Sequence, residues 1–163
     1  MVTHIANGMY GMMIVDSKTG WPRAQEVMLE QGEFYGDPDK DGMVSGSSTR
    51  MMDERPDFVV FNGVIEKYAD HPIQIKVGQP VGIFFVNAGP NCTSSYHVVG
   101  TVFSSVYRSG NPANVERDVQ TFEVGPGNGA VFESVHEAGD YPFADHAIAR
   151  AYKGAIGVFH AVP

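Results

Sequence analysis

Two histidines, His97 and His146, stand in stretches that could support metal binding or proton transfer. Near neutral pH, an imidazole can bind a metal ion when it is neutral and can donate a proton when it is charged. Two such rings held on rigid strands would predict one of these two chemistries. A histidine on a strand also occurs as a hydrogen-bonded core residue, and residue type alone leaves that interpretation open.

The single cysteine, Cys92, excludes an internal disulfide. It is consistent with a small buried hydrophobe or with a reactive thiol. A blue-copper centre needs a thiolate, two imidazoles and usually an axial methionine. All eight methionines lie at or before Met52, so none follows Cys92 on its own loop. The sequence therefore excludes a blue-copper centre built around this cysteine.

The elements that position His97 and His146 are predicted to be short strands. Residues 81–86 form a mostly apolar run that ends in a turn at residues 87–90, which is typical of a buried strand. Residues 95–99 then alternate, which predicts a second strand with His97 on one of its two faces. His146 lies about fifty residues further on, and we expect it on a separate strand.

The rest of the chain predicts an all-β fold. Many Gly and Pro residues punctuate short runs of Val, Ile, Phe and Tyr. About eight strands separated by turns indicate a Greek-key β-sandwich, with one helical turn expected at 146–153. The predicted strands are 58–61, 64–65, 73–77, 81–86, 102–107, 119–124, 130–132, 141–143 and 155–159, with a further strand at 26–35 whose Val27, Leu29 and Phe34 point inward.

Length and charge limit the function. The chain has 163 residues, enough for one domain with a core. Its net charge of −8 argues against binding to nucleic acid or to an anionic membrane surface. No apolar run approaches the roughly 20 residues of a membrane span, and no signal peptide is evident at the N-terminus.

Five short motifs occur in one order along nearly the whole chain: HIANGMYG at 4–11, FNG at 61–63, NAGPN at 87–91, SSYHVVG at 94–100 and DHAIARAYKGAIG at 145–157. Together they resemble the copper-containing nitrite reductases. The resemblance covers the second cupredoxin domain of that family and only the last strand of its first domain. It implies a one-electron reduction of nitrite to nitric oxide, with copper as the cofactor.

The resemblance also implies a domain organisation. Residues 1–18 would be the final strand of a first cupredoxin domain, residues 19–56 a linker, and residues 57–163 the second cupredoxin domain. The N-terminal segment is expected to start as a loop and to become a strand through residues 12–15. Because a lone strand leaves its edges and apolar side chains exposed, we expect it to complete a cupredoxin domain of a partner chain by strand addition.

Site residues follow from the motifs that match. In the family, the catalytic type 2 copper lies between subunits, and its third histidine ligand aligns with His146. The proton-transfer histidine aligns with His97. Val99 aligns with an aliphatic residue, often Ile, that packs over the copper and shapes nitrite binding. Thr121, in ERDVQTFEV, aligns with a hydroxyl residue that hydrogen-bonds the proton-transfer histidine.

His4 and Met9 align with the imidazole and the axial thioether of the family's type 1 copper. The cysteine ligand, the other type 1 histidine, two type 2 ligands and the catalytic aspartate are not in this sequence. The resemblance thus implies an N-terminal cupredoxin partner chain, from a split gene, a cleavage or a longer polypeptide, and a trimer of heterodimers. It also implies a periplasmic location and a small redox protein, a cytochrome or a cupredoxin, as electron donor.

There are two alternatives to a nitrite reductase. A multicopper oxidase is the less favoured one, because its trinuclear cluster needs His-x-His pairs and the sequence contains none. A non-catalytic cupredoxin-like module for binding or assembly would not need His97, Thr121 and His146 together. Asp145, beside His146, is expected to be solvated or to cap a turn. The remaining histidines match no motif, and we interpret them as surface or core residues: His71, His136 and His160.

Overall fold

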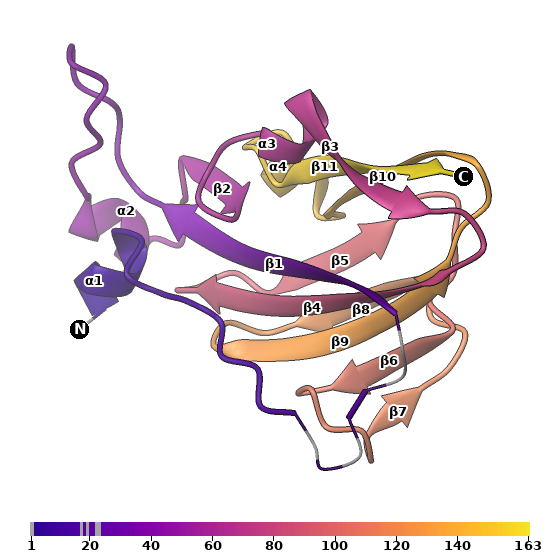
Figure 1. The fold of residues 1–163 in the computed structure, drawn as a ribbon. Helices are drawn as coiled ribbons and strands as arrows, with labels where there is room; N and C mark the ends of the chain where they lie inside the picture. The colour runs from indigo at the N-terminus through magenta and orange to yellow at the C-terminus, as the bar shows by residue number, and fades with distance from the viewer. Residues whose placement is uncertain (1, 17, 19, 22–23) are drawn as a thin grey trace.

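The computed structural model describes residues 2–16, 18, 20–21 and 24–163, which fold into two packed β-sheets with four short helices (Figure 1). The first sheet has the strand order β2-β1-β4-β9-β6-β7 and the second has the order β3-β11-β10-β5-β8. The strands of the first sheet are β1 (Gln25–Phe34), β2 (Phe58–Phe61), β4 (Pro80–Gly89), β6 (Ser105–Arg108), β7 (Val115–Glu116) and β9 (Asn128–Val135). Those of the second are β3 (His71–Lys76), β5 (Ser94–Val98), β8 (Thr121–Val124), β10 (Gly139–Asp145) and β11 (Ile156–Val162). The helices are α1 (Val2–Ala6), α2 (Ser48–Met52), α3 (Lys67–Asp70) and α4 (Ile148–Ala151).

The core lies between the two sheets because every second residue of the central strands is apolar and points inward. Its centre is a group of aromatic rings. The ring of Phe132 lies 4.7 Å from that of Phe103 and 5.0 Å from that of Tyr96, measured between centroids. Phe85 and Phe122 complete the contacts of Phe132 at 6.0 and 5.9 Å. The predicted all-β sandwich is confirmed, as is the helical turn after His146.

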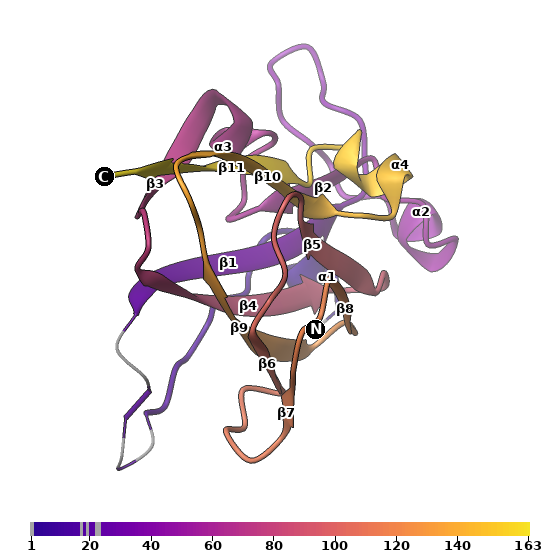
Figure 2. The same ribbon diagram turned by 90° about the vertical axis from the view of Figure 1, so that its right-hand side faces the viewer.

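Strand β1 lies within the range 19–56, which the sequence predicts to be a linker. It pairs antiparallel with β2 and parallel with β4, with Gln25 opposite Val81, and so occupies an interior position in its sheet (Figure 2). Its inward residues Val27 and Leu29 are buried, as predicted. Phe34 is out of phase with them and half-buried, and it lines a pocket, so the prediction that it points inward is wrong. The sandwich therefore begins at Gln25, and part of the predicted linker is structural.

The predicted strand through residues 12–15 is not present: no helix or strand is assigned to residues 9–16, and His4 lies in α1 rather than in a loop. The side chains nevertheless alternate as in a strand. Met12 and Ile14 pack on an apolar cluster of β4, β6 and β9, whereas Met13 and Val15 are 88% and 81% exposed. A strand requires a hydrogen-bonded neighbour, and this segment instead lies on the face of a sheet. Residues 1, 17, 19, 22 and 23 of the predicted first two segments lie outside the described residues.

Tyr10 fixes the N-terminal segment to β1. Its phenol lies over Gly32, and a Cβ at position 32 would be 2.1 Å from the phenol oxygen. Burial raises the pKa of Tyr10, with a smaller contribution from the charge of Glu30. Only a glycine at position 32 leaves room for this ring.

In the part of the chain that the structure describes, none of the helices has the length and apolar character needed to cross a bilayer.

Candidate copper and proton-transfer site

Two neighbouring strands of the second sheet position His97 and His146. Strands β5 and β10 pair antiparallel, with Ala144 opposite His97 and Asp145 opposite Tyr96. His146 is the first residue after β10, and its backbone N–H donates to the carbonyl of Ser95 at 2.8 Å. The two histidines are therefore brought together within one sheet rather than across the sandwich.

The imidazoles of His97 and His146 meet edge to face, with centroids 5.0 Å apart and planes at 84°. Nδ1 of His97 lies 2.7 Å from the carbonyl oxygen of Gln120 and 3.1 Å from Oγ1 of Thr121. Because a carbonyl can only accept, the proton of the shorter bond belongs to Nδ1. The neutral ring then carries its free acceptor at Nε2. The predicted contact between Thr121 and His97 is observed, and the carbonyl of Gln120 is a further contact that the sequence did not indicate.

Val99 lies two residues beyond His97, immediately after β5, and its side chain is exposed. Its backbone N–H donates to the carbonyl of Pro142 at 2.7 Å, which continues the pairing of the two strands. Residues 95, 97 and 99 share the more accessible side of β5, whereas Ser94, Tyr96 and Val98 are buried. Val99 and His97 therefore face the same side, as the alternation predicts.

Asp145 is fully buried, so the expectation of a solvated side chain is wrong. The expectation of a turn cap is correct, because its Oδ1 accepts from the backbone N–H of Ala147 at 3.1 Å. Its Oδ2 accepts from Nε of Arg150 at 2.6 Å. Burial acts to lower the pKa of Arg150, but the hydrogen bond and the charge of Asp145 outweigh it and the pKa is raised.

A second buried carboxylate, Glu33, lies on the inward face of β1. It accepts from the hydroxyl of Tyr35, and its Oε1 accepts from the backbone N–H of Cys92 at 2.7 Å. Burial, followed by the charge of Glu33, raises the pKa of the Cys92 thiol to about 11. The free thiol is thus protonated near neutral pH, which argues against a reactive thiolate.

His4 and Met9 come together through the backbone of the N-terminal turn. The N–H of Met9 donates to the carbonyl of His4 at 2.9 Å, and both side chains are exposed. An exposed imidazole and an exposed thioether at one turn match part of the donor set of a type 1 copper.

The residues present fit part of a copper site. Within the described residues, no group of three or more His, Cys, Asp or Glu side chains could hold a metal ion. The imidazole of His146 is exposed, and among the described side chains none hydrogen-bonds its ring. An imidazole with unbonded nitrogens is a suitable copper ligand, and the described residues do not supply a complete ligand set around it.

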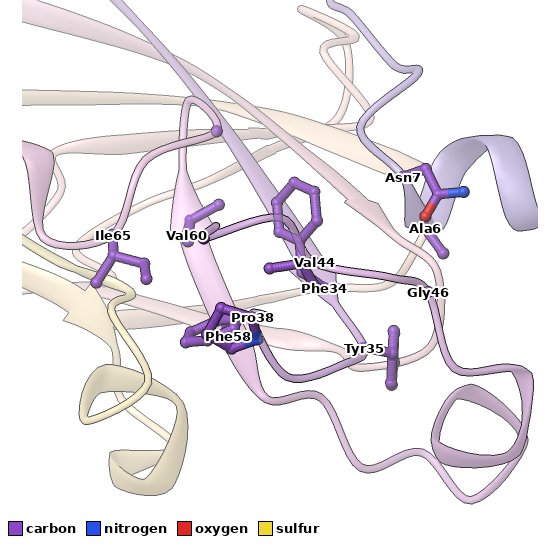
Figure 3. Close-up of a pocket in the computed structure, with 12 residues that line it drawn as sticks. Ala6, Asn7, Phe34, Tyr35, Pro38, Val44, Gly46, Phe58, Val60 and Ile65 are labelled. Atoms are coloured by element: carbon purple, nitrogen blue, oxygen red, sulfur yellow. The ribbon is translucent and has the colours of Figure 1, made fainter. Parts of the chain in front are cut away.

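A pocket of about 610 Å³, whose lining includes neither His97 nor His146, lies between α1, the loop 36–46 and β2 (Figure 3). Phe34, Val44, Val60 and Ile65 give it an apolar wall. Of the described residues that line it, Tyr35 alone is titratable, and burial together with Glu33 raises its pKa. This lining is unsuited to binding a metal or to transferring a proton.

The remaining histidines are structural or lie at the surface, as predicted. His136 is buried, Ser134 lies 2.9 Å from its Nε2, and burial lowers its pKa. His160 is exposed and pairs with Asp140, and His71 is exposed at the start of β3.

No protein-family model matches the chain. A curated relative, a copper-containing nitrite reductase of Neisseria gonorrhoeae, is 39% identical over 160 residues, which cover 94% of this chain and 41% of the relative. The chain thus spans about two fifths of the length of that relative.

Solved structures agree with this relationship. A copper nitrite reductase of Nitrosomonas europaea superposes with a TM-score of 0.88 at 38% identity, over 99% of this chain and 58% of that one. A multicopper oxidase structure superposes with a TM-score of 0.82 at 24% identity, over 98% of this chain and 52% of that one, which supports the fold alone. The predicted cupredoxin-like fold is confirmed. By sequence and by fold, the chain is a homologue of one part of the copper-containing nitrite reductases.

Proposed function

We propose that this chain is the C-terminal part of a copper nitrite reductase that converts nitrite to nitric oxide. The reaction takes up one electron and two protons for each nitrite and releases one water. The observation that carries the proposal is the edge-to-face pair of His97 and His146, 5.0 Å apart. In this proposal His146 is a ligand of a type 2 copper shared between subunits, and His97 is the proton-transfer residue.

The hydrogen bonds of His97 suit a proton donor. Gln120 and Thr121 hold Nδ1, so the proton that the ring gains and loses is at Nε2. That nitrogen is free to receive a proton from solvent and to pass it to an oxygen of bound nitrite. When bound, copper would supply the electron and a binding position for nitrite.

Val99 and Thr121 would adjust this site without taking part in bond making. Thr121 shares the Nδ1 proton and limits rotation of the His97 ring. Val99 presents an exposed aliphatic side chain on the same side as His97. Val is smaller than Ile, so nitrite would have more freedom of orientation above the copper.

The proposal extends to a partner. His4 and Met9 would supply two ligands of a type 1 copper, whose other ligands would come from an N-terminal cupredoxin part. The outward side chains Met13 and Val15 support this, because they leave an apolar edge for another domain to cover. We infer that residues 1–18 complete that domain, in a periplasmic trimer of heterodimers.

Copper analysis and electron paramagnetic resonance on the native assembly test the proposal. We expect type 1 and type 2 signals, a second, cysteine-bearing part in the mass spectrum, and nitric oxide release from nitrite with a reduced donor. Because the chain has a net charge of −8, the rate with a basic donor, such as a small cytochrome or cupredoxin, should fall as ionic strength rises. An assembly without copper and without nitrite-dependent nitric oxide would contradict the proposal.

Replacing His97 by asparagine should slow turnover and leave copper in place. Asparagine cannot carry a proton, and general acid catalysis is worth about 10²–10⁴-fold in rate. The rate of nitric oxide release and the copper content, measured on the same sample, report turnover and copper binding separately. His160→Asn, which changes an exposed histidine of β11, serves as the control. Loss of copper in His97→Asn would show that the roles of His97 and His146 are the reverse of those proposed.

A further inference from the structure

The carboxylate of Asp145 joins the two segments that carry the site histidines. Its Oδ1 accepts from the backbone N–H of Ser95 at 3.1 Å and from that of Ala147 at 3.1 Å. Ser95 precedes His97 by two residues on β5, and Ala147 follows His146 directly. One buried oxygen therefore holds both backbones at a fixed separation.

The second oxygen, Oδ2, ties this pair to the opposite sheet. Nε2 of Gln31 on β1 donates to it at 2.9 Å, and Nε of Arg150 on α4 donates at 2.6 Å. Gln31 is itself fixed, because Ser94 Oγ donates to its Oε1 at 2.7 Å. The Nη2 of Arg150 continues to the carbonyl of Thr93 at 2.7 Å. The aspartate is thus held by β1, by β5 and its preceding residue, and by α4.

The requirement is for a carboxylate rather than for any polar side chain. Both oxygens of Asp145 accept, and they face five donors, the fifth being Nη2 of Arg150 at 3.3 Å from Oδ1. Asparagine would present one oxygen, which accepts, and one NH₂ group, which cannot accept. The NH₂ group would face N–H donors and form no hydrogen bond with them. It would also leave the half-buried guanidinium of Arg150 without its charged partner. The segment carrying His146 would then separate from β5.

We propose that Asp145 is a positioning residue that sets the separation and the mutual orientation of His97 and His146. Its effect on copper and turnover rests on the proposed function, whereas its effect on the two rings does not. A purely structural role would affect only the stability of the fold. A positioning role predicts that substitution of Asp145 changes the separation and orientation of the two imidazole rings while the protein stays folded.

The test compares Asp145→Asn with Asp140→Asn in the full chain, labelled with ¹³C at histidine and free of copper. Asp140 lies on the same strand, β10, and is exposed. Asp140→Asn is therefore the same chemical change, and it leaves the buried hydrogen bonds of Asp145 intact. We expect the nuclear Overhauser cross-peak between the rings of His97 and His146 in the wild type and in Asp140→Asn. In Asp145→Asn it should be lost, and the dissociation constant for Cu(II) in the native assembly should rise about 10–100-fold, the usual effect of removing an orienting partner of a ligand.

The outcomes separate this proposal from the one on which it rests. A cross-peak of full intensity in Asp145→Asn would overturn the positioning role. A lost cross-peak with unchanged copper affinity and turnover would support positioning and contradict the assignment of His146 as a copper ligand.

If Asp145→Asn does not fold, Arg150→Gln gives a milder change, because it keeps the carboxylate and both backbone donors. Its control is Arg108→Gln, which breaks an exposed pair with Glu116. We expect a weaker cross-peak in Arg150→Gln than in Arg108→Gln, and equal cross-peaks would overturn the proposal.

Discussion

Type 2 copper and nitric oxide release are both expected to disappear when His146 is replaced by alanine in the native assembly. The imidazole of His146 is exposed, and none of the described side chains forms a hydrogen bond with it. Alanine has no side-chain atom that can bind copper. A residue that only orients a ligand is worth about 10–100-fold in metal affinity, so loss of a ligand should cost at least that much. Copper analysis, the type 2 resonance signal and the rate of nitric oxide release measure the loss.

The control for His146→Ala is His71→Ala, because His71 is an exposed histidine at the start of β3. It should keep the copper content and the rate of the wild type. Full activity in His146→Ala would favour the alternative that the chain is a non-catalytic binding or assembly module. A type 1 signal that persists in His146→Ala would show that the second copper is bound independently.

Replacing Phe132 by alanine should lower the free energy of unfolding by about 3–5 kcal/mol, the usual cost of removing a large aromatic side chain from a core. Phe132 is fully buried, and its ring contacts the rings of Phe85 on β4, Tyr96 on β5, Phe122 on β8 and Phe103 before β6. The neighbours cannot close the space without moving the sheets toward each other. Urea unfolding of the same assembly, followed by fluorescence and circular dichroism, gives the change.

Tyr152→Ala is the matched control, since this aromatic side chain is 85% exposed. Its effect should stay within about 0.5 kcal/mol. An equal effect of the two substitutions would mean that the aromatic group around Phe132 does not form the stabilising core.

The alternation of apolar and polar residues predicted those strands whose structure depends mainly on neighbouring residues in the sequence. Residues 73–77 alternate, and β3 occupies most of them. The strand that carries His97 was also predicted, because the alternation of residues 95–99 is a local signal. The turn expected at residues 87–90 begins later than predicted, because β4 continues through Gly89. The contact between Thr121 and His97 was implied by the resemblance, and it is present because β5 and β8 pair with these two residues opposite each other.

Long-range contacts were not predictable in the same way. The burial of Asp145 depends on Gln31, 114 residues earlier. A signal existed, since Gln31 and Glu33 continue the inward positions that Val27 and Leu29 occupy earlier in the same strand. Polar residues at such positions indicate a buried hydrogen-bond network. In the single chain residues 12–15 do not form a strand, because alternation alone does not supply a partner for their backbone. Strand addition to a partner chain stays a prediction.

The position of β11 has a consequence for biosynthesis. In the second sheet β11 lies between β3 and β10, and pairs parallel with β3, with Phe159 opposite Ile73. Until residues 156–162 leave the ribosome, β3 has no neighbour in this sheet and β10 has an open edge. The sheet therefore closes only after synthesis of its last strand, by a contact between distant parts of the chain, which is a slow kind of step. In that interval the exposed edges are open to pairing with other nascent chains.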